Sequence, residues 1–331
     1  MSEPKIRRTQ IRARDTLHLL GGVRAGTHAN GHLVIFPSRN KAAILVPSVV
    51  ATQNYWSAIK TFELDIVGHE TETEENGIHH SQWHLFELGT PILDSALVTW
   101  SHIAYAAHQK HDTEVANLAR DIAFSLRAAD LRLRDISRAY GWQNHYATWT
   151  GCTPGRYFAN LELSDLYLAL HSFLAEASAA RDYLARFVAS KMLDFADIDS
   201  MAKLYRRLQK NGRAENVVAQ TVLKICDRRS PTGWMARLSE FRNLVLHRSP
   251  IMRWSEKRYL VANVLNVGNR EVLTIYLGLP RDPINDPGGD FIDALSHFRD
   301  LLMLLLRFAS GVAKVSPIRP QMPQITAADL R

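Results

Sequence analysis

Apolar residues recur at helical spacing over most of the chain after residue 90. Thr90-Pro91 and Ser230-Pro231 each place a capping residue before a proline in the first helical turn, where the missing N–H costs nothing. The apolar positions Leu118, Ile122, Leu126, Ala129 and Leu133 then follow one helix face. The pattern predicts helices over about 91–110, 113–140, 165–192, 200–210, 214–226, 231–249 and 290–314.

The N-terminal part has a different pattern. Two short apolar runs, 32–36 and 42–46, flank a polar turn and predict a small β-hairpin. We expect residues 1–15 to be a mobile basic arm and Ser48 to cap a helix that runs to about residue 67. The acidic, Gly-containing segment 69–82 is typical of a surface loop.

A second hairpin is predicted at 258–277, where two apolar runs flank a Gly-Asn turn, and a loop is expected at 280–289. The fold class is therefore mainly α: a helical bundle with a small N-terminal β-hairpin and a β-hairpin inserted before the last helix. Gly, Pro and polar residues in 141–158 indicate a boundary. The expected division is 1–47 (basic arm and hairpin), 48–150 (N-terminal helical region), 151–316 (helical domain) and 317–331 (Pro-rich tail).

Composition narrows the class of protein. Apolar residues make up 46% of 331 positions, enough for a core. The two cysteines, Cys152 and Cys226, form no disulfide framework and suit a reducing compartment. The N-terminus lacks the apolar run of a signal peptide, and the longest apolar stretch, 301–309, is too short for a membrane span. We expect a cytoplasmic protein with no membrane partner.

Positive charge is concentrated in one segment. Residues 203–258 carry 14 Lys and Arg against four acids, a net +10 in a chain whose total is +7. Such a block favours a polyanionic partner through counterion release. A solvated helix face is the alternative interpretation.

The stretch EFRNLVLHRSP, residues 240–250, lies in this block. One narrow arc of its helix, predicted to face the core, holds Trp234, Leu238, Phe241 and Val245. Glu240, Asn243 and His247 fall on the opposite side, and Asn243 can fix the His247 tautomer. Arg242 lies between the arcs and can bind a phosphate bidentately, while His247 can act as a general acid or base.

These residues resemble the HEPN superfamily of helical-bundle proteins, many of them ribonucleases. Its signature is Arg, then four to six residues of which the first is polar, then His near a helix end; here it is Arg242-Asn243-Leu244-Val245-Leu246-His247. The flanking Glu240 is also similar to one branch, which makes it a candidate catalytic residue together with Arg242, Asn243 and His247. The resemblance covers about 165–315. Some members carry a Tyr two residues after the His, which a partner modifies; Ser249 stands there in this chain.

The resemblance implies a metal-independent active site formed across a homodimer. His247 would move protons, Arg242 would stabilise the transition state and Asn243 would orient the reacting groups, so that the ribose 2′-hydroxyl attacks and leaves a 2′,3′-cyclic phosphate. With 30 Arg and 14 His, an Arg followed by His at this spacing arises by chance roughly four times in such a chain. The alternative interpretation is therefore an ordinary amphipathic helix without catalytic function.

Other constellations are less specific. A basic face that could hold RNA phosphates, together with Arg248 beyond the motif, consists of Lys203, Arg206, Arg207 and Lys210. His79, His80 and His84 lack a third ligand at a telling distance, which favours a loop over a metal site. Aromatic residues around 142–158 fit packing between two halves better than base stacking. The sequence has no cofactor fingerprint.

The leading hypothesis is a homodimeric HEPN endoribonuclease without metal or cofactor. The resemblance alone implies a role in growth arrest or phage defence, as in toxin–antitoxin pairs and antiviral defence, with an antitoxin or regulatory protein as a further partner. A non-catalytic module that binds RNA, a nucleotide or a protein is the second hypothesis. An unrelated helical scaffold with a chance motif is the third.

Overall fold

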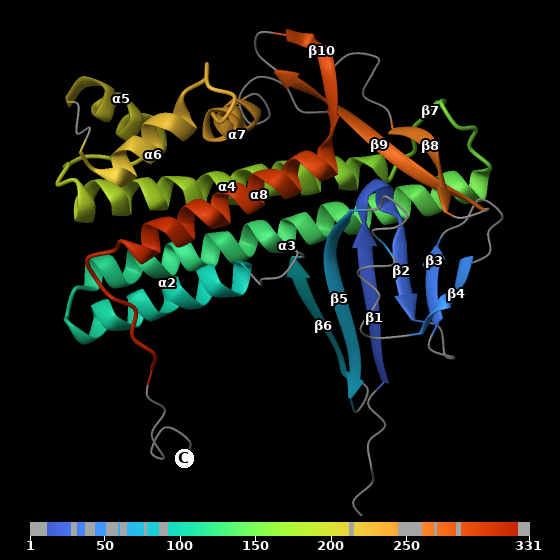
Figure 1. Ribbon diagram of the computed structural model, residues 1–331, viewed down its shortest axis with the longest axis horizontal. Coiled ribbons are helices and arrows are strands. Elements are labelled where there is room, and N and C mark those ends of the chain that lie inside the picture. The colour runs from blue at the N-terminus through green and yellow to red at the C-terminus, as the bar shows by residue number, and fades with distance from the viewer. Residues whose placement is uncertain are drawn as a thin grey trace, which may run out of the picture. The chain divides into compact units, whose positions relative to one another are not determined.

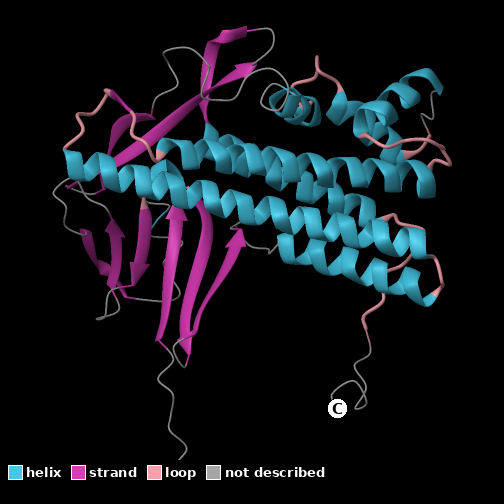
Figure 2. Cartoon of the chain, turned by 180° about the vertical axis from the view of Figure 1, so that it is seen from behind, coloured by secondary structure: helices cyan, strands magenta, loops and turns pink. Residues whose placement is uncertain are grey.

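The computed structural model shows a mainly helical chain accompanied by two antiparallel sheets (Figures 1 and 2). The structure describes residues 12–27, 32–36, 44–50, 59, 65–75, 78–85, 92–211, 215–243, 260–267, 270–282 and 286–323. The chain divides into two compact units, each assembled from three segments. The first unit comprises Met1–Phe86, Ser137–Leu163 and Tyr259–Leu277, and the second comprises Glu87–Ile136, Ser164–Arg258 and Gly278–Arg331.

A six-stranded antiparallel sheet dominates the first unit, in the order β4-β3-β2-β1-β5-β6. Its strands are β1 (Arg12–Leu19), β2 (Arg24–Thr27), β3 (His32–Phe36), β4 (Ile44–Val50), β5 (Ile66–Glu75) and β6 (Ile78–Leu85). In the register of the central strand β1, Thr16 pairs with Gly26 on one side and with Glu70 on the other. The predicted hairpin is confirmed as the β3–β4 pair.

Three predictions for this region are wrong. The helix expected from Ser48 to about residue 67 is wrong at its two ends, where β4 and β5 lie; Ile59 is helical, and the other residues of 51–64 lie outside the described residues. The expected surface loop 69–82 is the β5–β6 hairpin, and 12–15 of the expected mobile arm belong to β1. In β5, alternating Thr and Glu suit a strand with one solvated face, but they also make the segment look like a polar loop.

The core of the first unit lies between the sheet and neighbouring elements. It contains Leu17, Leu19, Val23, Ala25, Leu33, Ile35, Ile59, Ile66 and Val272. The last turns of helix α3 (Thr113–Thr150) lie against β1, the turn after it, and β9. Asn144 donates to the carbonyl oxygens of Gly21 and Leu273, at 3.1 and 2.9 Å. These partners explain why α3 continues into the segment expected to be an irregular boundary.

Gly22 makes the closest approach between this turn and α3. Its φ is +74°, and a Cβ placed there would overlap the carbonyl group of Tyr140. Only glycine meets both conditions without strain.

The second sheet has the order β10-β9-β8-β7. Its strands are β7 (Tyr157–Phe158), β8 (Leu260–Val267), β9 (Arg270–Asp282) and β10 (Asp286–Asp293). The β8–β9 pair confirms the predicted hairpin before the last helix. The loop expected at 280–289 is wrong, since β9 continues to Asp282 and pairs with β10.

The second unit contains β10 and the end of β9 but consists mainly of helices, and its described helices were all predicted from the sequence. They are α2 (Ile92–Gln109), the first part of α3, α4 (Leu163–Met192), α5 (Met201–Asn211), α6 (Val217–Cys226), α7 (Trp234–Asn243) and α8 (Ala294–Lys314). Buried rings join the long helices: Trp100 of α2 meets Phe187 of α4 edge to face at 4.9 Å, and Phe173 of α4 stacks on Phe298 of α8 at 5.1 Å. No described helix is long and apolar enough to cross a membrane.

Candidate functional site

Helix α7 carries the described part of the motif and is fixed by its apolar arc. Trp234, Leu238 and Phe241 are buried, as predicted, and the Phe241 ring meets Phe298 of α8 edge to face at 6.2 Å. Val245, the fourth predicted member of this arc, lies outside the described residues. The opposite side of α7 is thereby directed away from α8, which leaves its polar residues for other contacts.

Arg242 and Asn243 stand together at the C-terminal end of α7. The Arg242 Nη1 donates to the Asn243 Oδ1 at 3.1 Å. Arg242 is half-buried and Asn243 is exposed, so this polar end reaches solvent. The predicted catalytic His247 and the predicted RNA-binding Arg248 lie outside the described residues, so their roles stay predictions.

Glu240 has a different environment from the one its helical position indicates. Its position along the helix predicts that Glu240 lies on the polar side of α7. The residue is nevertheless only 7% exposed, and its Oε1 accepts a hydrogen bond from Nε of Arg228, in the turn after α6. Arg228 remains 61% exposed on its side chain. The guanidinium of Arg228 therefore neutralises the buried carboxylate of Glu240 while facing solvent itself. This pairing offsets the free-energy cost of burying the carboxylate.

A groove of about 290 Å³ lies between α5, the end of α6 and α7. Its lining residues are Met201, Ala202, Tyr205, Cys226, Arg228, Met235, Ala236, Ser239, Glu240 and Asn243. The groove thus combines an apolar floor with the Arg228–Glu240 pair and the amide that Arg242 contacts. Sequence reasoning did not identify it, because its walls come from three separate helices.

Adjacent residues of α4 hold the groove walls in place. Arg181 Nη1 donates to the Ser239 hydroxyl of α7 at 2.6 Å, and the Asp182 carboxylate accepts from the backbone N–H of Met201, at the start of α5, at 3.0 Å. Arg181 and Asp182 also pair with each other. Because one charged pair binds both helices, the spacing of the groove is set by α4.

Neither the thiol nor the phenol that lines the groove is activated as a nucleophile. Burial raises the pKa of Cys226 to about 12, so the thiol stays protonated near neutral pH. Burial, reinforced by the negative charge of Asp227, also raises the pKa of Tyr205. Both groups therefore act as neutral surface and, for the phenol, as a hydrogen-bonding group.

The predicted basic face of α5 is present and exposed. Lys203, Arg206, Arg207 and Lys210 all lie on the solvent side, opposite the buried Met201, Leu204 and Leu208. Three of the four have described partners: Lys203 pairs with Asp199, Arg206 Nε donates to the carbonyl oxygen of Ala202 at 3.3 Å, and the Arg207 guanidinium lies 5.6 Å from the centre of the Phe195 ring. This basic face can therefore contact phosphates while α5 stays folded. Of its local contacts, only the exposed ion pair of Lys203 would have to break.

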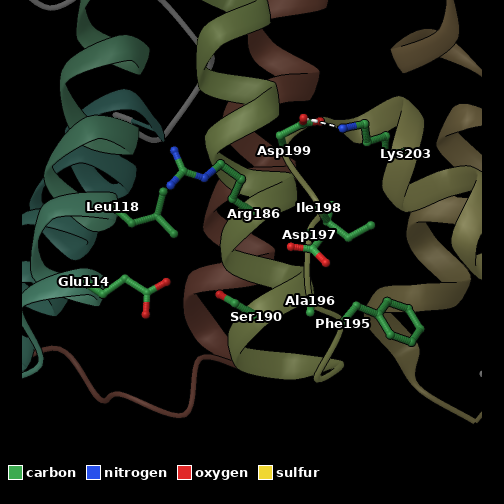
Figure 3. Close-up of a pocket in the computed structure, with 10 residues that line it drawn as sticks. All are labelled: Glu114, Leu118, Arg186, Ser190, Phe195, Ala196, Asp197, Ile198, Asp199 and Lys203. Atoms are coloured by element: carbon green, nitrogen blue, oxygen red, sulfur yellow. Dashed lines mark hydrogen bonds and ion pairs between the residues drawn. The ribbon is translucent and has the colours of Figure 1, made fainter.

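A larger cavity of about 550 Å³ borders the same helix (Figure 3). Glu114 comes from α3, Arg186 from α4, and Asp197 and Asp199 from the segment between α4 and α5; Lys203 is the contribution of α5. Three carboxylates against two cations make this cavity a poor site for a polyanion. The basic face is thus better represented by Arg206, Arg207 and Lys210.

A buried Ser–His–Glu row in the first unit was not predicted. His18 of β1 lies 3.1 Å from the Ser137 hydroxyl of α3 through Nδ1, and its Nε2 lies 3.1 Å from the Glu70 carboxylate of β5. Glu70 also accepts from Arg138 and from the Ser81 hydroxyl, the latter at 2.6 Å. The order of groups resembles that of a nucleophilic triad.

Burial argues that this row is a structural anchor. Ser137 is 2% exposed and His18 is 1% exposed, so no substrate reaches the hydroxyl in the folded chain. Hydrogen bonds from His18, Arg138 and Ser81 lower the pKa of Glu70 against the opposing effect of burial, and burial lowers that of His18. A charged Glu70 with a neutral His18 therefore ties α3 to the sheet.

The remaining sequence candidates lie elsewhere. His79, His80 and His84 are on β6, and the described residues contain no group of three His, Cys, Asp or Glu placed to hold a metal ion. Trp142 and Trp149 are 54% and 68% exposed on α3, and the His145 ring contacts both of their rings. Comparisons with family models, curated proteins and solved structures find no match for this chain.

Proposed function

We propose that the protein is a metal-independent endoribonuclease of the HEPN type. The observation that carries the proposal is the end of α7, where Arg242 bonds to Asn243 and Asn243 borders a groove of nucleoside size. The exposed basic face of α5, which contributes to the same groove through other residues, supplies phosphate contacts. Arg242 and His247 are the proposed catalytic residues, and Asn243 orients them.

The proposed reaction is an intramolecular transesterification. The ribose 2′-oxygen forms a bond to phosphorus while the bond from phosphorus to the 5′-oxygen breaks, leaving a 2′,3′-cyclic phosphate. One His247 accepts the 2′-hydroxyl proton and the His247 of a second copy protonates the leaving 5′-oxygen. Arg242 stabilises the charge that develops on the phosphoryl oxygens. Histidine and arginine suffice for these steps.

The active unit in this proposal is a homodimer with a composite site. A role in growth arrest or phage defence, and control by an antitoxin or other regulatory protein, follow from the HEPN resemblance.

Cleavage of a structured RNA in the presence of EDTA tests the enzyme. The wild type is compared with His247→Ala and Arg242→Ala, and with Arg237→Ala as a control that removes an arginine from the same helix but outside the motif. We expect cyclic-phosphate ends with the wild type and control, and a loss of about 100-fold or more in each motif variant. Equal cleavage by all four proteins would refute the assignment.

A non-catalytic RNA-binding module is the second candidate, favoured by the exposed charges of α5. A folded wild type that binds RNA but leaves it intact would support it. In that case the logarithm of affinity should fall with the logarithm of salt concentration, and each lost phosphate contact should reduce the slope by about 0.7. Arg206→Ala and Lys210→Ala are the variants for this measurement.

A further inference from the structure

The groove beside α7 has an apolar floor of flexible and small side chains. Met201 and Met235 are almost completely buried, and Ala202 and Ala236 widen the space between α5 and α7. Thioether and methyl groups suit the flat face of an aromatic ring, and Tyr205 adds an aromatic wall. At about 290 Å³, the groove is at the small end of the range for ligand pockets, roughly 300–1,000 Å³, and has room for one nucleoside.

The rim of the groove presents a donor and an acceptor side by side. Within the described residues, the Arg228–Glu240 contact uses Nε of the guanidinium and Oε1 of the carboxylate. The two terminal nitrogens of Arg228 therefore remain as donors, and Oε2 of Glu240 remains as an acceptor. Because Glu240 is fixed by burial and Arg228 by the pair, these groups are held in position before a ligand arrives.

We propose that this groove binds a guanine base of the RNA, read by Arg228 and Glu240; the inference rests on the proposed ribonuclease function and names its substrate preference. Guanine places acceptors, O6 and N7, beside donors on N1 and the 2-amino group. Arginine is the usual partner of the guanine acceptors. The carboxylate of Glu240 matches the donors.

The other bases match the rim less well. Adenine offers a donor where guanine has O6, which would face the guanidinium. Uracil has no amino group for Glu240, and cytosine offers one donor to the carboxylate on a smaller ring that covers less of the floor. A base seated in the groove would leave its 3′-phosphate at the end of α7, where Asn243 lines the rim and Arg242 contacts Asn243.

Titration of the full chain with the four nucleoside 3′-monophosphates, followed by calorimetry, tests the subsite. We expect the guanosine nucleotide to bind about tenfold or more tightly than the other three. Glu240→Gln, which keeps the shape of the side chain but removes its charge, should abolish this preference. Ala236→Leu should block all four nucleotides by filling the groove.

Ala175→Leu is the matched control, since it makes the same substitution on an exposed position of α4, away from the groove. It should bind like the wild type. Ala236→Leu also decides the question if Glu240→Gln fails to fold. Equal affinity for the four nucleotides, or a guanine preference that survives Ala236→Leu, would overturn the proposal.

A parallel cleavage assay separates the two proposals. RNA cut without preference for guanine, by a chain that does not discriminate the nucleotides, would remove the subsite and leave the nuclease. Guanosine nucleotide bound selectively by a chain that cuts no RNA, even as a dimer, would remove the nuclease and leave a guanine-binding groove.

Discussion

The buried His297 predicts that acid lowers the stability of the second unit, and this effect tests how that unit is packed. The ring lies on α8, 5.1 Å from the Phe241 ring of α7, and its Nε2 is buried without a hydrogen-bond partner among the described residues. Burial, reinforced by the charges of Arg237 and Arg281, lowers the pKa of His297 from 6.5 to about 3. His297→Phe removes this titration and keeps an aromatic ring between Phe241 and Phe298.

The magnitude follows from linkage. As the pH falls through about 6.5, the unfolded chain binds a proton at this ring, whereas the folded chain stays neutral until about pH 3. The unfolded state therefore binds more protons in this window, and stability falls as the pH drops. Between about pH 7.5 and about pH 5 the loss is about 2 kcal/mol, set almost entirely by the unfolded-state pKa.

Urea unfolding at the two pH values, followed by circular dichroism, measures the effect. The stability of His297→Phe relative to the wild type should rise by about 2 kcal/mol on acidification, because contributions from all other groups cancel in the comparison. A difference between His297→Phe and wild type that is constant with pH would refute the burial argument.

Three further predictions concern other parts of the chain. Glu70→Gln should lower the free energy of unfolding by about 3–5 kcal/mol, because it leaves Arg138 and His18 without their charged partner. Ser81→Ala, which removes one neutral hydrogen bond to Glu70, should lower it by about 1 kcal/mol, and urea titration measures both. Gly22→Ala should cost more than about 2 kcal/mol from its positive φ and its overlap with Tyr140, whereas Gly311→Ala, in open space on α8, should stabilise by about 0.5–1 kcal/mol in the same assay. Cys226 should react with a thiol reagent near pH 8 about tenfold or more slowly than the half-buried Cys152, and equal rates in the native chain would contradict its raised pKa.

Helices were predictable from the sequence because their signals are local. The capping residues, first-turn prolines and apolar spacing each lie within one element, so α2 and α4 to α6 begin and end within a few residues of expectation. The exception is the end of α3. Its polar residues looked like a boundary, yet Gln143 exchanges two hydrogen bonds with Asn160, and Asn144 binds distant carbonyl groups. Such partners are invisible to a local pattern.

Strands and their pairing were less predictable. The β5–β6 hairpin is rich in Glu, Thr and His, and its stability depends on neighbouring strands that lie far away in sequence, such as β1 against β5. Pairing with neighbouring strands therefore overrides the loop propensity of this segment. The same limit hid the His18–Glu70–Ser137 row, whose members are separated by 52 and 119 positions.

The candidate site was predictable in part. The sequence pattern predicted the helix that carries Arg242 and Asn243, and the α5 charges follow a simple helical face. The burial of Glu240 was not predictable, because it depends on the turn after α6 bringing Arg228 to it. The groove likewise depends on how three helices are held by Arg181 and Asp182, which no single segment reveals.

The interleaving of the two units has a practical consequence for genetic dissection. The backbone passes between them five times, and α3 crosses the boundary at Ile136 without leaving its helical path. A gene fragment for residues 151–316 would retain the four strands β7 to β10 but lose the six-stranded sheet and the end of α3, which belong to the same unit as β7 and β8. Truncation would therefore report misfolding in place of function, and roles in this chain are better assigned by point substitution in the intact protein.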